Sequence, residues 1–270
     1  MSILQSIILG IVQGITEFLP VSSSGHLQLV KELLGVQIAD NVTFDVALHA
    51  GTVCSTLLVL WREVWGLVKG VFSTRLNESH AFVAKIIVSM VPIGIVGFAF
   101  RDSLDALLAS QYCILVVGGS LLLTSVLLWF ASSSSAKLND DKRSEIGYWD
   151  ALWIGVAQAV AVLPGVSRSG ATISSGLILG KRRGEVATFS FLMVLAPIMG
   201  SMLLDFVKDG GELVVEGVSS VALAAGFLSS FVVGALACKA MIAIVQRGRL
   251  IYFSIYCAVV GAVAVLSYFI

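Results

Sequence analysis

Residues able to carry out nucleophilic or acid–base chemistry gather near the start of the chain, on both sides of a proline. Gln13 and Glu17 are four residues apart, so a helix would place them on one face. Beyond the proline, Ser22 and Ser23 lie four and three residues before His26 and can share its face. A serine beside a histidine is a nucleophile–base pair in the general sense. A nearby carboxylate can hold a divalent cation, or it can orient and charge the histidine.

A second polar cluster stands half a chain later and is suited to binding an anion. Ser167, Arg168 and Ser169 follow Pro164, and Thr172 comes one turn further on. Serines at a helix start satisfy free backbone N–H groups, and a helix N-terminus attracts phosphate through its partial positive charge. Arg168 adds a planar cation that can bind two phosphate oxygens at once.

The two clusters belong to a duplicated pattern. Leu9–Gln13 (LGIVQ) recurs as Ile154–Gln158 (IGVAQ), and Leu19–His26 (LPVSSSGH) recurs as Leu163–Gly170 (LPGVSRSG). The offset is 145 residues at the glutamines and again at the glycines of the two tips. Serines at such tips are more often helix caps than nucleophiles. Two duplicated tips that carry the strongly polar groups of an apolar chain are nevertheless poorly explained by packing alone.

The composition indicates a membrane protein. Of 270 residues, 57% are hydrophobic and 13% are charged, whereas soluble domains carry about 25% charged residues. The net charge is zero and no nucleic-acid-binding signature is present. We therefore expect an all-α polytopic membrane protein with no nucleic-acid partner.

Six apolar runs are long enough to span a bilayer, and two Pro-broken segments are not. The helices of those two segments reach only about 20–25 Å each, so we interpret them as re-entrant hairpins covered by protein or water. Each half then has one hairpin and three spans, and an odd number of spans inverts the second half relative to the first. The first repeat is 1–131, with a hairpin at 3–34 and spans at 44–61, 82–100 and 113–130. A cytoplasmic linker at 132–148 precedes the second repeat, 149–270, with a hairpin at 149–180 and spans at 186–207, 218–245 and 250–270.

Positive charge predicts the orientation, because short cytoplasmic loops are enriched in Lys and Arg. The side opposite the N-terminus holds Arg62, Lys69, Arg75, Lys137, Lys142, Arg143, Lys181, Arg182, Arg183, Arg247 and Arg249. The N-terminal side holds only Lys31, Arg101 and Lys208. We expect both termini on the side of the membrane that faces away from the cytoplasm.

The motifs resemble those of the undecaprenyl-diphosphatase family, also called bacitracin-resistance proteins. The family pattern (E/Q)-x-x-x-E, followed by FLPVSSSGH, matches Gln13 to His26. The second pattern, P-G-x-S-R-S-x-x-T, matches Pro164 to Thr172 at every fixed position. Length, spacing and hydropathy agree over the whole chain.

The resemblance implies a phosphatase that hydrolyses undecaprenyl diphosphate to undecaprenyl phosphate and inorganic phosphate, recycling the lipid carrier of cell-wall synthesis and conferring bacitracin resistance. It implies dependence on Mg²⁺ or Ca²⁺. Carried over by motif position, the catalytic residues are Glu17, Ser23, His26 and Arg168, the substrate-binding residues Ser22, Ser167, Arg168, Ser169 and Thr172, and the metal ligands Glu17 and Gln13. Many members have Glu at position 13, so only Glu17 supplies an anionic ligand within this motif.

Several points stay open at the level of sequence. The nucleophile is Ser23 with His26 as its base, His26 itself, or water. Asp45 and His49 begin the span that follows the first hairpin and are candidate supporting groups. The rival function is a lipid-phosphate flippase or anion transporter built on the same inverted repeats; it needs an anion site but no nucleophile. The partners expected are a polyprenyl diphosphate and membrane lipid, and a homo-oligomer is left open.

Overall fold

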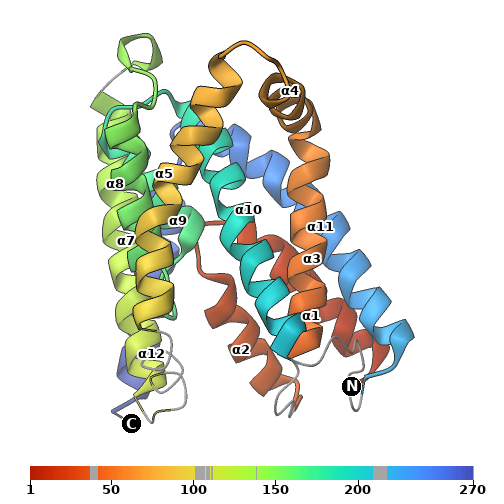
Figure 1. Ribbon diagram of the computed structural model, residues 1–270. Helices are drawn as coiled ribbons and strands as arrows, with labels where there is room; N and C mark the ends of the chain where they lie inside the picture. The colour runs from red at the N-terminus through yellow and green to blue at the C-terminus, as the bar shows by residue number, and fades with distance from the viewer. Residues whose placement is uncertain are drawn as a thin grey trace.

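The computed structural model describes residues 1–36, 42–100, 107, 110, 112–137, 139–208 and 218–269, with side chains for all of these except 42, 43, 98 and 205–208. Every regular element in this part of the chain is a helix (Figure 1). The helices are α1 (Ile3–Phe18), α2 (Ser23–Leu33), α3 (Val42–Val59), α4 (Trp61–Val71), α5 (Glu78–Ala99), α7 (Cys113–Lys137), the 3₁₀ turn η1 (Asp140–Lys142), α8 (Tyr148–Val160), α9 (Arg168–Ile178), α10 (Arg183–Lys208), α11 (Ser220–Gln246) and α12 (Ile251–Ser267).

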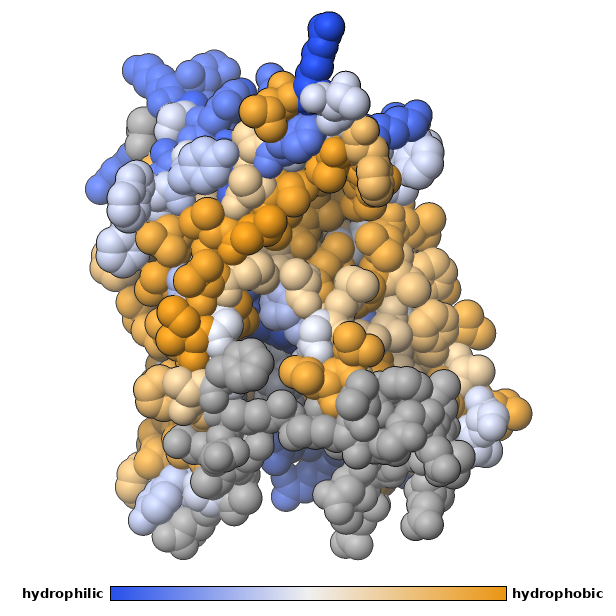
Figure 2. All heavy atoms as spheres, viewed as in Figure 1, coloured by the Kyte–Doolittle hydropathy of each residue, from blue (hydrophilic) through white to orange (hydrophobic). Residues whose placement is uncertain are grey.

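The prediction of an all-α polytopic membrane protein is confirmed. Among the described residues, α5, α7, α10 and α11 are long and apolar enough to cross a bilayer, and they coincide with four of the six expected spans. The expected spans 44–61 and 250–270 appear as α3 and as the shorter apolar helix α12. Figure 2 shows a broad hydrophobic belt across the face in view, with hydrophilic residues gathered at the top.

The sequence analysis missed helix α4. The expected span 44–61 ends at residue 59, and α4 then turns away from α3 by 79°. Arg62 lies over the ring of Trp61, and Lys69 lies over the ring of Trp65. Cations and exposed tryptophans on one short helix are typical of a segment that lies along a membrane surface rather than crossing it.

The two Pro-broken segments form helical pairs at opposite ends of the molecule. The α1–α2 pair lies in the lower half of Figure 1, near both termini, and the α8–α9 pair lies in the upper half. Helix α1 begins with a reciprocal cap between Ser2 and Gln5 and ends before Pro20, whose ring excludes a helical hydrogen bond. Ser167 caps α9 by accepting a hydrogen bond from the backbone N–H of Gly170.

Equivalent glycines set how the two pairs pack. A Cβ at Gly10 of α1 would lie 2.4 Å from the carbonyl oxygen of Gly226 on α11. A Cβ at Gly155 of α8, 145 residues later, would lie 2.3 Å from the carbonyl oxygen of Ser89 on α5. Only glycine allows backbones to approach this closely. The first helix of each half, α1 or α8, therefore packs against its neighbouring helix through a glycine.

The polar segment after α7 holds the α8–α9 pair against the other helices. The Arg143 side chain is fully buried and donates hydrogen bonds to the carbonyl oxygens of Leu177, Lys181 and Ser134. A cation at the end of α9 satisfies carbonyl groups that the helix leaves free. Of the charges used to predict orientation, Arg101 and the side chain of Lys208 lie outside the described residues.

Candidate active site

Glu17, at the end of α1, is the centre of the polar network inside the bundle. Its side chain is 7% exposed. One carboxylate oxygen accepts hydrogen bonds from Gln13 Nε2 at 2.9 Å and from Ser23 Oγ at 2.7 Å. The other oxygen lies 3.3 Å from Nη2 of Arg168. Three of the residues expected in the site, from both halves of the chain, thus meet on one carboxylate.

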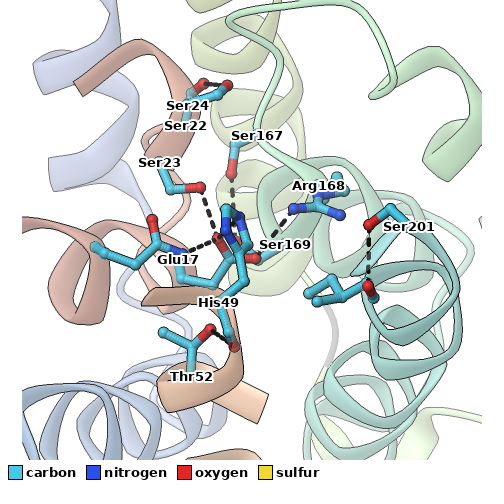
Figure 3. A network of polar contacts seen from close by, with 12 residues as sticks. Glu17, Ser22, Ser23, Ser24, His49, Thr52, Ser167, Arg168, Ser169 and Ser201 are labelled. Atoms are coloured by element: carbon cyan, nitrogen blue, oxygen red, sulfur yellow. Dashed lines mark hydrogen bonds and ion pairs between the residues drawn. The ribbon is translucent and has the colours of Figure 1, made fainter. Parts of the chain in front are cut away.

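Ser23 and Arg168 occupy equivalent places in the two halves. They are 145 residues apart, and each is the first residue of its helix, α2 and α9. Both helices therefore begin at Glu17, with their N-terminal ends and positive dipole ends at the site. Figure 3 shows Ser23 and Arg168 directed at the carboxylate from different elements.

His49 is a site residue that the motifs did not assign to the centre. Its Nε2 lies 3.8 Å from the Glu17 carboxylate, and its Nδ1 donates to the carbonyl oxygen of Asp45 at 2.8 Å. Figure 3 shows the imidazole facing Glu17 and Ser23 from α3. The sequence indicated His49 only by its position near the start of the span that follows the first hairpin, where we expected a supporting group. Asp45 itself pairs with Lys31 and lies outside the network.

The expected Ser23–His26 pair is not formed in the structure. The Ser23 hydroxyl donates to Glu17, whereas both ring nitrogens of His26 contact other groups: Nδ1 lies 2.8 Å from the carbonyl oxygen of Ser22, and Nε2 lies 2.6 Å from the hydroxyl of Tyr256. Helical spacing allowed Ser23 and His26 to share a face, but Ser23 is the first helical residue and its side chain turns back toward α1.

Ser22 does not cap α2 with its side chain. It has a φ of 71° and a ψ of 100°, and it is the one described non-glycine residue with a positive φ. Its hydroxyl contacts Ser24 at 3.4 Å. Residues other than glycine avoid positive φ values, so this conformation is strained. Such strain is concentrated at functional sites.

The expected substrate-binding residues of the second tip are ordered by contacts to one another. Ser167 Oγ lies 3.2 Å from Ser169 Oγ, and the Ser169 hydroxyl donates to the carbonyl oxygen of Leu19. Thr172 is fully buried and donates back to the carbonyl oxygen of Arg168. These hydroxyls hold the tip in shape, and Arg168, with 27% of its side chain exposed, is the group that can reach a ligand.

A small cavity of about 20 Å³ adjoins the network. Glu17 and Ser169 contribute polar atoms to its lining, and the apolar lining comes mainly from Val53 on α3 and from Phe191, Val194, Leu195 and Ile198 on α10. Figure 2 shows a hollow in the hydrophobic belt with hydrophilic residues at its bottom. The polar centre is thus bordered on this side by apolar side chains.

The oxygen donors near Glu17 fit a hard divalent cation. Among the described residues, Gln13 Oε1 is buried and has no hydrogen-bond partner, although its amide nitrogen donates to Glu17. Carboxylate and amide oxygens are ligands that Mg²⁺ and Ca²⁺ accept. No group of three or more His, Cys, Asp or Glu side chains suited to a metal is found in the part of the chain that the structure describes, so substrate or water oxygens would have to complete the coordination of such an ion.

Comparisons with known proteins identify relatives along nearly the whole chain. Residues 6–263 match the family model described as "Bacitracin resistance protein BacA". The chain is 48% identical to an undecaprenyl-diphosphatase of Bacteroides thetaiotaomicron over 99% of each chain. It is 47% identical to one of Parabacteroides distasonis and 44% identical to one of Christiangramia forsetii, over 98% of each chain in both cases.

Proposed function

We propose, because the chain belongs to the bacitracin resistance protein BacA family, that it hydrolyses undecaprenyl diphosphate to undecaprenyl phosphate and inorganic phosphate. This reaction recycles the lipid carrier of bacterial cell-wall synthesis and confers bacitracin resistance. The observation that carries the proposal is the meeting of Ser23 and Arg168 on the Glu17 carboxylate, beside an apolar cavity. It places a hydroxyl, a proton acceptor and a phosphate-binding cation within one polar network inside the hydrophobic belt.

The chemistry follows from those contacts. Ser23 Oγ attacks the terminal phosphorus while its proton passes to Glu17, which already accepts it in a 2.7 Å hydrogen bond. The bond from that phosphorus to the bridging oxygen breaks, and undecaprenyl phosphate leaves with the electron pair. Glu17 passes this proton to the departing phosphate, which regenerates the carboxylate. Water then attacks the phosphoserine and gives a proton to Glu17, the bond from phosphorus to Ser23 Oγ breaks, and Oγ takes the proton back as inorganic phosphate is released. His49, which faces Glu17, is placed to exchange the proton with the carboxylate.

Charge stabilisation is assigned to the second tip. Phosphoryl transfer depends on positioning and on neutralising the charge of the equatorial oxygens. Arg168 and the N-terminal ends of α2 and α9 supply positive potential at this point. A bound Mg²⁺ or Ca²⁺, held by oxygens of Glu17 and Gln13, would add Lewis-acid stabilisation of the same oxygens.

The transporter alternative fits less well. An anion carrier or flippase needs the arginine and the helix ends but no hydroxyl hydrogen-bonded to a buried carboxylate. The Ser23–Glu17 contact therefore favours the enzyme.

Phosphate release by the purified protein in detergent tests the proposal. We expect inorganic phosphate from undecaprenyl diphosphate, loss of the activity with EDTA, and recovery when Mg²⁺ or Ca²⁺ is restored. No release with either cation present would overturn the function. Full activity after exhaustive chelation would remove the cation from the proposal and leave the hydrolysis intact.

Replacement of Arg168 by lysine tests the phosphate clamp. Lysine keeps the charge but loses the planar fork, and a lost charge-assisted hydrogen bond of about 1.5–3 kcal/mol lowers turnover about 10- to 150-fold. Arg182→Lys is the matched control, because Arg182 pairs with Glu145 at the surface. Turnover of Arg168→Lys equal to that of the control would show that Arg168 only balances Glu17.

We further propose that the protein lies in the bacterial inner membrane as two inverted repeats, 1–131 and 149–270, with re-entrant hairpins at α1–α2 and α8–α9 and a cytoplasmic linker at 132–148. Both termini lie at the same end of the molecule, opposite α4 (Figure 1). The excess of Lys and Arg at the α4 end supports a cytoplasmic location for that end. Labelling of the termini by a membrane-impermeant reagent in intact cells measures their location.

A further inference from the structure

Helix α12, which carries none of the motif residues, holds the first tip at two neighbouring positions. Tyr256 OH lies 2.6 Å from Nε2 of His26, and the thiol of Cys257 donates to the carbonyl oxygen of Pro20 at 3.5 Å. The rings of His26 and Tyr256 also stack, with centroids 5.7 Å apart and planes 20° apart. Contacts between residues 230 or more positions apart fix the tip against a helix of the other half.

The partners of His26 determine where its proton lies. The carbonyl oxygen of Ser22 can only accept, so Nδ1 carries the hydrogen of the 2.8 Å contact. In the neutral ring Nε2 is then unprotonated and accepts the hydrogen bond that Tyr256 donates. Each nitrogen has one partner, so neither is free to take a proton from Ser23 or to attack phosphorus.

These contacts converge on the strained residue. The Ser22 carbonyl accepts from Nδ1 of His26 and, at 3.3 Å, from the backbone N–H of His26. Ser22 is 3% exposed and keeps a φ of 71°. A conformation of this kind persists only where its surroundings over-determine it. Ser23 follows directly, so the direction of its hydroxyl depends on how Ser22 is held.

We infer that Tyr256 and His26 form a positioning pair that holds Ser22 in its strained conformation, so that the Ser23 hydroxyl points at Glu17. His26 is then a positioning residue in place of a base or nucleophile, and Tyr256 fixes its tautomer. This inference rests on the proposed function, because its effect is read through hydrolysis.

Tyr256→Phe tests the hydroxyl alone, because phenylalanine keeps the ring that stacks on His26. We expect kcat to fall roughly 2- to 10-fold, the effect of one lost neutral hydrogen bond, with KM nearly unchanged. Tyr252→Phe is the matched control: Tyr252 lies one turn earlier on α12, is 68% exposed, and should leave kcat unchanged. Equal kcat for the two variants would overturn the inference. An inactive wild-type protein would instead reject the proposed function.

Three replacements of His26 separate positioning from chemistry. Asparagine places an amide N–H where Nδ1 stands, whereas glutamine places one near Nε2, and alanine has neither. If His26 positions Ser22, His26→Asn should retain activity at the level of Tyr256→Phe and exceed His26→Gln and His26→Ala by about 5-fold or more. If Nε2 takes part in the reaction, His26→Asn should be as inactive as His26→Ala, which would overturn the inference.

A double-variant cycle and a spectroscopic measurement complete the test. Tyr256→Phe should lower kcat no further in the His26→Asn background, because that background already lacks the acceptor of the Tyr256 hydrogen bond. In protein labelled with ¹⁵N-histidine, Nε2 of His26 should resonate as an unprotonated nitrogen and should shift in Tyr256→Phe but not in Tyr252→Phe. Additive losses in the cycle, or a protonated Nε2 at neutral pH, would contradict the pair.

Discussion

Ser23→Ala should abolish hydrolysis while leaving the protein folded. The hydroxyl is the group we assign to attack phosphorus, and loss of an activated nucleophile lowers turnover by on the order of 10³- to 10⁶-fold. Only one hydrogen bond, to Glu17, is removed with it. Phosphate release by the variant, measured beside its thermal unfolding temperature, checks both statements.

Ser24→Ala is the matched control for that variant. Ser24 is exposed, and its hydroxyl contacts only Ser22 among the hydrogen bonds of the described residues. We expect nearly wild-type turnover from it. Acid quenching of the wild-type reaction should trap a phosphoserine that maps to Ser23. Substantial activity in Ser23→Ala would assign the attack to water, and a phosphoryl group trapped on another residue would assign it to that residue.

Glu17→Gln should lower turnover about 10²- to 10⁴-fold, because it removes the proton acceptor of the reaction while keeping the shape of the side chain. The amide can still accept hydrogen bonds from Gln13 and Ser23, so the local fold should persist. It cannot balance the charge of Arg168, which is partly exposed and remains solvated. Turnover and the binding of a non-hydrolysable diphosphate, measured without added Mg²⁺, should therefore separate, with binding retained and turnover lost.

Glu32→Gln is the control for the change in charge. Glu32 is an exposed glutamate near the end of α2, away from the network. If both variants kept wild-type turnover, Glu17 would be a structural partner of Arg168 and the proton would need another acceptor. His49, 3.8 Å from Glu17, would be the first residue to replace.

Much of this arrangement can be predicted from the sequence because it depends on the pattern of apolar and polar residues. The apolar runs predicted the long helices, and the prolines predicted where α1 ends. The resemblance carried by the motifs implied one site with residues from both tips, and in the structure Ser23 and Arg168 both contact Glu17. Each of these inferences needs only helical periodicity, the loss of a hydrogen bond at proline, and the cost of polar groups in lipid.

The errors arise where a single backbone torsion or a distant helix decides the geometry. The positive φ of Ser22 sets the start of α2, so the face shared by Ser23 and His26 in an ideal helix does not bring their side chains together. Tyr256 is remote in sequence and belongs to no motif, so spacing carried no signal for its contact with His26. Helix α4 was missed because an apolar run does not show where a helix bends away.

The equivalent positions of Ser23 and Arg168 carry different residues, which is possible only because both halves belong to one chain. Two identical subunits related by a symmetry axis must carry the same residue at the same position, so a dimer of one half would present two hydroxyls or two guanidiniums to the carboxylate. Joining the halves in one chain removes that constraint. In this single chain the position holds a serine in the first half and an arginine in the second, and Val162 stands 145 residues after Glu17. One chain can therefore bring two different groups to a single carboxylate, which a symmetric pair of identical half-length subunits could not do.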